Sequence, residues 1–253
     1  MISIITPTYN SAGFIAETIE CIQQQTYKDW ELLITDDCST DDTVEIVKSY
    51  AAADSRIKLF CLEKNGGGGV SRNNSIEKAQ GRYIAFCDSD DRWLPDKLET
   101  QLAFMEKTGA AFTYASYLLC NEQGDDCGIT VCRKRISYRK ILMDNYIGCL
   151  TAMYDTQKVG KVYMPLIRKR QDWGLWIRII KKCRVAYGIK KPLGIYRIRE
   201  NSVSSNKLIL IKYHAMLYKE MLHLPLFCGY LMYFFVNLPS FVLKQLRSKI
   251  VNI

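Results

Sequence analysis

Three carboxylates lie within four residues near the middle of the N-terminal half, at Asp88, Asp90 and Asp91. Carboxylates this close repel one another, and a nearby cation relieves the repulsion. Hard oxygen ligands of this kind suit Mg²⁺ or Mn²⁺, which keep several waters and also bind substrate phosphates. A solvated acidic turn before the helix expected near Pro95 would show the same pattern. The cluster alone is therefore consistent with either a metal site or a helix cap.

The segment that positions these carboxylates, residues 82–87, is an apolar run typical of a buried β-strand. Similar runs occur at residues 2–6, 31–35 and 57–61, and helical periodicity fills the segments between them. Strands that alternate with helices in this way predict a parallel sheet with helices on both faces.

In such a sheet, ligands bind beyond the carboxyl ends of the strands. The residues expected at those ends are Pro7-Thr8-Tyr9, Asp36-Asp37, the glycine-rich segment Asn65 to Arg72, and Asp88 to Asp91. One edge of the sheet therefore gathers an aromatic ring, two groups of carboxylates and an arginine. The glycine run has neither the Gly-Lys-Ser/Thr of a P-loop nor the position of a dinucleotide-binding motif.

The chain has 253 residues, enough for one large domain whose core needs no crosslinks. Its ten cysteines are scattered, no Cys-x-x-Cys pair occurs, and no signal peptide precedes the first strand. These features predict a reduced, cytoplasmic protein without a zinc site.

The net charge of +9 is unevenly distributed along the chain. Residues 1–132 carry a net charge of −10, residues 133–199 carry +15 and residues 200–253 carry +4. Basic segments indicate anionic partners such as nucleic acid, a membrane surface or a phosphorylated substrate. The acidic half disfavours nucleic acid, because it would repel the phosphates.

Five short motifs then occur in a fixed order: Thr6-Pro7-Thr8-Tyr9-Asn10, Gln25-Thr26-Tyr27, Asp36-Asp37-Cys38-Ser39-Thr40-Asp41, Ser71-Arg72-Asn73 and Asp88-Ser89-Asp90-Asp91. In this order they resemble the signatures of family 2 glycosyltransferases, and the resemblance covers about residues 1–200. It implies an α/β fold of the GT-A type with a mostly parallel central sheet. It also implies an inverting transfer of one sugar from a nucleotide-sugar, expected to be a UDP-sugar, to a hydroxyl acceptor in surface polysaccharide synthesis, with Mg²⁺ or Mn²⁺ on the diphosphate.

The resemblance also implies donor-binding roles for Pro7, Thr8, Tyr9, Asp36, Asp37, Arg72, Asp88, Ser89 and Arg199. Among these, the ring of Tyr9 would stack on the nucleobase and Asp37 would accept the imide N–H of the base. Arg72, whose planar guanidinium is permanently charged, would approach the base or the diphosphate. The implied metal ligands are Asp88, Asp90 and Asp91, with Asp90 or Asp91 binding the ion directly.

Simpler interpretations of three of these residues remain open. Tyr9 fits an ordinary packed ring, and Arg72 fits a surface ion pair. Arg199, in the segment 196–204 that resembles the family's closing segment, stands where a His often occurs. An arginine can contact phosphate but is a poor metal ligand, and a basic surface loop would look the same.

Asp172 belongs to a second chemical centre. The apolar residues after it share one face of a predicted helix, so Asp172 lies in the first turn, where a carboxylate is a normal cap. The resemblance implies instead that Asp172 is the general base that takes the proton from the acceptor hydroxyl. Family members commonly have Glu-Asp here, whereas this chain has Gln171-Asp172. Asp172 must then meet Asp88–Asp91 across the cleft.

The predicted domains are a GT-A unit at 1–204, with a nucleotide-sugar-binding half at 1–115 and an acceptor half at 116–204, and a helical tail at 205–253. Residues 224–243 carry no charge and are long enough to span a bilayer, although Pro225 and Pro239 interrupt them. A transmembrane helix, an in-plane anchor and a helix packed on the catalytic domain all remain open. Basic flanks around an aromatic-rich segment favour peripheral contact with the inner face of the cell membrane, and a glycan or lipid-linked glycan as acceptor.

Two other functions are consistent with parts of the sequence. A sugar nucleotidyltransferase shares the strand-end carboxylates, but it usually has a glycine-rich loop with a basic residue where this chain has Pro7-Thr8-Tyr9. A non-catalytic module that binds anionic membrane surfaces would explain the basic half, but not the carboxylates. Transfer of a single sugar is favoured over polymerisation, because the Gln-x-x-Arg-Trp motif of processive synthases does not occur.

Overall fold

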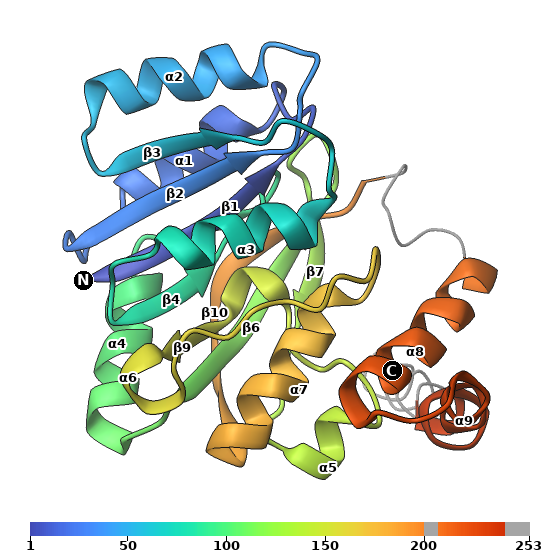
Figure 1. Ribbon diagram of the computed structural model, residues 1–253. Helices are drawn as coiled ribbons and strands as arrows, with labels where there is room; N and C mark the ends of the chain where they lie inside the picture. Colours follow the sequence, from blue (N-terminus) through green and yellow to red (C-terminus); the bar gives the residue numbers. More distant parts are fainter. Residues whose placement is uncertain (200–206, 241–253) are drawn as a thin grey trace.

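The computed structural model describes residues 1–199 and 207–240 (Figure 1). The strands are β1 (Ile2–Thr8), β2 (Trp30–Asp36), β3 (Ile57–Cys61), β4 (Tyr83–Phe86), β5 (Arg92–Trp93), β6 (Phe112–Cys120), β7 (Asp126–Thr130), β8 (Arg135–Ser137), β9 (Met153–Asp155) and β10 (Val185–Arg197). The helices are α1 (Ile15–Gln23), α2 (Thr43–Ala53), α3 (Gly68–Lys78), α4 (Lys97–Thr108), α5 (Tyr138–Ile141), η1 (Cys149–Thr151), α6 (Thr156–Val159), α7 (Gln171–Cys183), α8 (Lys207–Leu222), α9 (Leu226–Met232) and the π-helical η2 (Tyr233–Asn237). The predicted boundary between residues 204 and 205 and the end of the predicted closing segment lie outside the described residues.

All ten strands belong to one mostly parallel sheet, with the order β3-β2-β1-β4-β9-β6-β10-β5, β7 beside β6 and β8 beside β10. Pairing is parallel from β3 through β4 and again between β6 and β10. The short strand β9 runs antiparallel between these two groups. The predicted α/β architecture is therefore confirmed. The predicted division between residues 115 and 116 falls inside β6, so the sheet is continuous across it.

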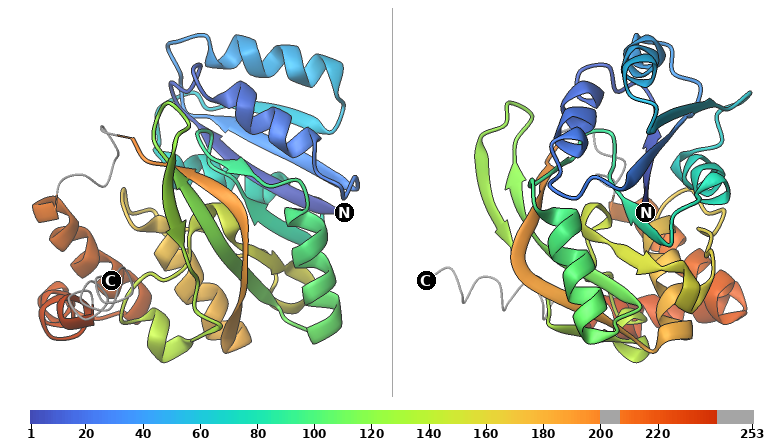
Figure 2. Two further views of the ribbon diagram at one scale, coloured as in Figure 1. Left: turned by 180° about the vertical axis from the view of Figure 1, so that it is seen from behind. Right: turned by 90° about the vertical axis from the view of Figure 1, so that its left-hand side faces the viewer.

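The central strands separate two hydrophobic cores, because successive side chains of a strand point to opposite faces. Ile4 and Leu32 contribute to the core beneath α1, α2 and α4, whereas Ile5 and Leu33 contribute to the core beneath α3 and α7. Strands buried on both faces must be apolar throughout, which explains the unbroken apolar runs in the sequence. Figure 2 shows the helices on both sides of the twisted sheet.

Two tryptophans fix helix α7 on this sheet. The ring of Trp176 contacts Phe86 of β4 edge to face, with the ring centres 5.4 Å apart. Trp173 donates from Nε1 to the carbonyl of Ile141 at 2.6 Å. Phe86 lies just before Asp88, and Trp176 lies one helical turn after Asp172. These contacts therefore bring the first turn of α7 toward the end of β4.

The C-terminal helices pack beside α7 and α5 (Figure 1). Tyr218 of α8 donates from its hydroxyl to the carbonyl of Leu142 at 2.7 Å. Within the described part of the chain, no single helix has both the length and the apolar character needed to cross a membrane. The helices Leu210–Leu222 and Leu226–Ser240 meet that test only as a pair, and they are bent by 114° at the break between them.

The core beneath α4 contains an unpaired amine. Lys97 is fully buried, and its Nζ has no hydrogen-bond partner among the described residues. The ammonium position lies 3.7 Å from the centre of the Trp93 ring. Burial lowers the pKa of Lys97 to about 7, because desolvation disfavours the charged form.

Replacing Lys97 with Met should stabilise the protein, and by more at pH 7 than at higher pH. An unfolded lysine titrates near 10.5, so between about pH 7 and that value the unfolded chain holds a proton that the folded chain has lost. The penalty for burying Lys97 is therefore complete below about pH 7 and declines as pH rises. We expect Lys97→Met to raise the free energy of unfolding by about 3 kcal/mol at neutral pH, less near pH 9. Guanidinium denaturation at both values would measure this, and a pH-independent difference would contradict it.

Candidate active site

The guanidinium of Arg72, on α3, lies between the acidic cluster and the start of α7, because both Arg72 and Gln171 lie beside Gly68. Arg72 forms an ion pair with Asp88. Burial opposes its charged form, but the negative charges of Asp88 and Asp172 act in the other direction and hold the pKa of Arg72 above its ordinary value. Cys149 also lies close to Asp88, with its Sγ 4.0 Å from Oδ1. Arg72 therefore pairs with a residue at the end of β4 and feels the charge of a residue at the start of α7.

Asp172 lies in the first turn of α7, as predicted, and is half-buried. Its Oδ2 accepts a hydrogen bond from Nδ2 of Asn145 at 2.8 Å. The residue before the helix, Arg170, has a positive φ of 65°, which turns the chain sharply into α7. The carboxylate is thus held by a side chain from the segment after α5 and remains able to accept further donors.

Glycines allow α3 to approach α7 at this point. A Cβ at Gly69 would lie 3.0 Å from Cδ of Gln171, and one at Gly68 would lie 2.9 Å from Nη1 of Arg72. Both separations are shorter than ordinary van der Waals contact, so larger residues would push these side chains away. The glycine-rich segment therefore provides space around Arg72 and Gln171. It needs no P-loop signature for this role.

Asp36 and Asp37 make contacts within the protein. The two carboxylate oxygens of Asp37 accept the backbone N–H groups of Gly66 and Gly67, at 2.7 and 2.8 Å. Asp36 accepts both the backbone N–H and the hydroxyl of Ser39. Both carboxylates are almost fully buried. They order the loops at the ends of β2 and β3, and their predicted contacts with the base and ribose stay predictions.

The residues at the end of β1 differ in exposure. Pro7 and Thr8 are buried, and the Thr8 hydroxyl has no hydrogen-bond partner in the part of the chain that the structure describes. Tyr9 is 50% exposed, which disfavours the interpretation of a packed ring. Ser89 lies 2.9 Å from Ser11, hydroxyl to hydroxyl, and ties this loop to the acidic cluster.

Asp90 faces Arg199, whose Nη1 lies 3.2 Å from Oδ2 of Asp90. Burial and the neighbouring charge of Asp88 raise the pKa of Asp90, and the contact with Arg199 partly opposes this. Arg199 therefore lies at the acidic cluster, not in a solvated loop distant from it.

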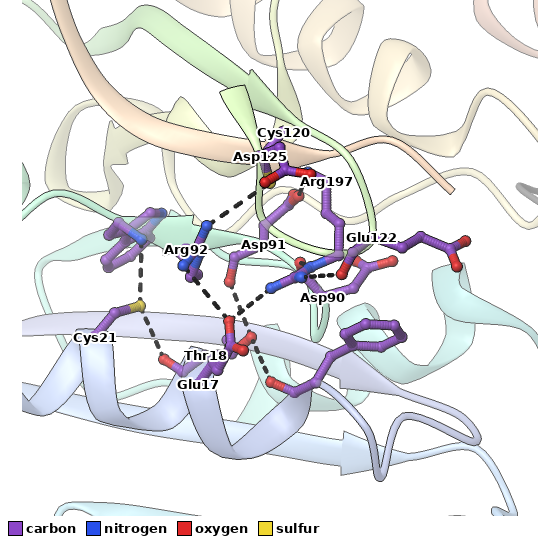
Figure 3. Close-up of polar contacts among 12 residues, drawn as sticks. Glu17, Thr18, Cys21, Asp90, Asp91, Arg92, Cys120, Glu122, Asp125 and Arg197 are labelled. Atoms are coloured by element: carbon purple, nitrogen blue, oxygen red, sulfur yellow. Dashed lines mark hydrogen bonds and ion pairs between the residues drawn. The ribbon is translucent and has the colours of Figure 1, made fainter. Parts of the chain in front are cut away.

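The Asp91 side chain is buried in the protein. It is 1% exposed, and its Oδ1 accepts the backbone N–H of Arg197 at 3.1 Å. Figure 3 shows it between α1 and β10. Among residues 1–199 and 207–240, no three His, Cys, Asp or Glu side chains are grouped so that they could hold a metal ion. Asp91 is turned inward here, and the assignment of Asp88, Asp90 and Asp91 as metal ligands stays a prediction.

Arg197, in the segment 196–204 that resembles the family's closing segment, supports the acidic loop from behind (Figure 3). Its guanidinium donates to the carbonyls of Asp90 and Glu122, at 3.1 and 2.9 Å, and pairs with Glu17 at 2.6 Å. Its side chain is almost completely buried. Nothing in the sequence around it distinguishes it from Arg199.

Replacing Arg197 with Met should lower the free energy of unfolding by about 3 kcal/mol, because buried carbonyls and Glu17 would lose their donor. Arg199→Met provides a matched control. The Arg199 side chain is 35% exposed, so its removal should change stability by less than about 1 kcal/mol. Urea denaturation would measure both variants, and equal losses would contradict the supporting role of Arg197.

The model of glycosyl transferase family 2 matches residues 3–154, more than half of the chain. The chain belongs to this family. A Bacillus subtilis protein provisionally named as the teichuronic acid biosynthesis glycosyltransferase TuaG is 42% identical over 221 residues, which cover 87% of this chain and 88% of that protein. The Escherichia coli UDP-Glc:alpha-D-GlcNAc-diphosphoundecaprenol beta-1,3-glucosyltransferase WfgD is 38% identical over 208 residues, which cover 82% and 81%.

Solved structures of glycosyltransferases show the same fold. Staphylococcus aureus TarS in complex with UDP-GlcNAc has a TM-score of 0.73 at 22% identity, over 93% of this chain and 73% of that one. The mannosyltransferase PcManGT of Pyrobaculum calidifontis, in complex with GDP-Man and Mn²⁺, has a TM-score of 0.66 at 15% identity, over 100% and 80%. This family 2 chain is thus a glycosyltransferase of the GT-A fold, as predicted, rather than a nucleotidyltransferase or a non-catalytic binding module.

Proposed function

We propose that this glycosyltransferase moves one sugar from a UDP-sugar to a hydroxyl group of a lipid-linked glycan, in the synthesis of a surface polysaccharide. The observation that carries the proposal is that Arg72, which pairs with Asp88, lies beside the first turn of α7, which carries Asp172. The name of the Escherichia coli relative, which gives a UDP-glucose donor and a diphosphoundecaprenol-linked acceptor, supports both substrate classes.

Asp172 acts as the general base. It takes the proton from the acceptor hydroxyl while that oxygen attacks the anomeric carbon. Asn145 holds the carboxylate through its 2.8 Å hydrogen bond, so the base keeps one orientation as the acceptor arrives. Attack in line with the departing diphosphate inverts the anomeric centre in a single displacement.

The residues present fit a divalent cation bound through two carboxylates. Asp88 and Asp90 each already pair with an arginine, Arg72 and Arg199 respectively, so positive charge is stabilised at this place. They would hold Mn²⁺ or Mg²⁺, and diphosphate oxygens and water would complete the coordination. The ion, when bound, neutralises the charge that develops on the leaving nucleoside diphosphate. Arg72 and Arg199 contact the same diphosphate through charge-assisted hydrogen bonds.

Removing divalent ions should lower sugar transfer by about 100-fold or more, because the leaving diphosphate would lose its neutralising charge. The measurement is UDP release from UDP-glucose or UDP-GlcNAc with a lipid-linked acceptor, with EDTA and after adding back Mn²⁺. If transfer continued at the same rate in EDTA, the reaction would not require a divalent ion, and that part of the proposal would be rejected. Exclusive use of GDP- or dTDP-sugars would reject the UDP donor.

A further inference from the structure

Helix α9 and the turns that follow it present an apolar surface to solvent. Five exposed side chains recur at intervals of one, three and four residues: Phe227, Leu231, Phe234, Phe235 and Leu238. These intervals place them on one face of a helix. Phe227 is 70% exposed and Phe235 is 76% exposed. We call these five residues the α9 stripe. Grouped apolar side chains of this size on a protein surface mark an interaction site.

The opposite face of the same segment is fixed to the protein. Gly229 packs so closely on α8 that a Cβ there would meet a backbone oxygen at 2.4 Å. Asn237 donates to the carbonyl of Met143 at 2.9 Å, and the hydroxyls of Ser240 and Tyr146 lie 2.9 Å apart. The fold therefore holds the α9 stripe outward and does not allow it to turn into the core.

Cationic side chains lie near the end of the segment that carries the α9 stripe, on its protein-facing side. Arg133 and Lys140 lie over the ring of Tyr146, at 4.8 and 5.1 Å from its centre. The same ring carries the hydroxyl that meets Ser240, just beyond Leu238. In sequence, no Asp or Glu follows Glu220, and the basic residues that do follow it are Lys244, Arg247 and Lys249.

This combination matches an anionic bilayer better than a second copy of the chain. A phospholipid surface offers apolar chains below a layer of phosphates, so it satisfies both the rings and the cations. A symmetric dimer through the α9 stripe would bring two sets of cations together. Insertion across the bilayer is disfavoured, because the chain bends by 114° before α9 and one side of α9 is held by α8.

We propose that the α9 stripe docks this protein in the plane of an anionic phospholipid surface. The benefit to catalysis rests on the proposed function, in which the acceptor is lipid-linked. Tyr218 of α8 contacts Trp173 of α7, with ring centres 6.0 Å apart, and Trp173 directly follows Asp172. Docking through α8 and α9 therefore holds the helix that carries the base in a fixed relation to the surface. Figures 1 and 2 show α8 and α9 on the side of the molecule toward which β1, β2 and β3 run.

The test is sedimentation of the full chain with vesicles of phosphatidylcholine, with and without phosphatidylglycerol. The double variant Phe227→Ser/Phe235→Ser should reduce binding to the anionic vesicles by about tenfold or more, because two rings no longer enter the bilayer. The matched control is Ile129→Ser/Val131→Ser, which replaces two exposed apolar residues in and beside β7. It should bind as the wild type does. Wild-type binding should weaken with added salt, because salt screens the cations.

Undiminished binding of the Phe227→Ser/Phe235→Ser protein would overturn the proposal. So would a wild-type dimer in lipid-free solution that the same variant dissociates, since the stripe would then be a dimer interface. Transfer to a water-soluble acceptor analogue should be unchanged in the variant, whereas transfer to an acceptor embedded in vesicles should fall with binding. A wild-type protein that binds vesicles through the stripe but uses no sugar nucleotide would reject the proposed function and leave the docking surface intact.

Discussion

Replacing Asp172 with Asn should lower kcat for sugar transfer by about a thousandfold, within the range that general bases contribute. Asparagine has nearly the same shape but cannot take the proton of the acceptor hydroxyl. Its amide oxygen can still accept the hydrogen bond from Asn145, which the wild-type carboxylate accepts at 2.8 Å. Donor binding and thermal stability should therefore change little. Steady-state UDP release with saturating donor and acceptor measures the effect.

The same variant distinguishes the base from a helix cap, the alternative that the sequence left open. Asp172 is the second residue of α7, so the neutral asparagine would lose only the favourable interaction of the carboxylate with the helix dipole, about 0.3–1 kcal/mol. If Asp172 only stabilised α7, then Asp172→Asn would keep nearly full activity. If it is the base, then activity is lost while the unfolding midpoint stays near that of the wild type. An active Asp172→Asn enzyme would therefore end the catalytic assignment.

The centre of the sheet could be predicted because β1, β2 and β4 are buried along their whole length, and such strands appear as largely apolar runs. The predicted strand at residues 57–61 coincides with β3, and the strand before Asp88 coincides with β4 to within one residue at each end. The rule that parallel strands end at one edge then placed Tyr9, Asp37 and Asp88 together. Strand β9 could not be predicted, since three residues between β4 and β6 show no usable periodicity.

The arrangement within the site was less predictable. Asp172 was placed there only by resemblance, and the physical cause, the contact between Trp176 and Phe86, joins segments ninety residues apart. Asn145 and Cys149 lie in a segment without regular pattern, so their contacts with Asp172 and Asp88 had no sequence signal. No sequence pattern indicated that the Asp91 side chain would be buried, either. Side chains alternate predictably along a strand but not in the turn that follows one.

Replacing Asp90 with Asn should weaken Mn²⁺-dependent binding of UDP by about 100-fold, because one of the two proposed carboxylate ligands loses its charge. Arg199 would also lose the partner that holds it 3.2 Å from Asp90. Titration calorimetry of UDP with and without Mn²⁺ separates the metal-dependent part of the affinity. Binding without the metal should be nearly the same for the variant and the wild type.

Asp91→Asn is the matched control, because it makes the same chemical change one residue away. Asp91 is 1% exposed and accepts the backbone N–H of Arg197. An amide oxygen can accept that N–H as well, so the metal-dependent affinity should be kept. The resemblance alone allowed either Asp90 or Asp91 as the direct ligand, and we propose Asp90, because the Asp91 side chain is buried. If Asp91→Asn lost the metal-dependent affinity while Asp90→Asn retained it, Asp91 would have to turn outward when the donor binds.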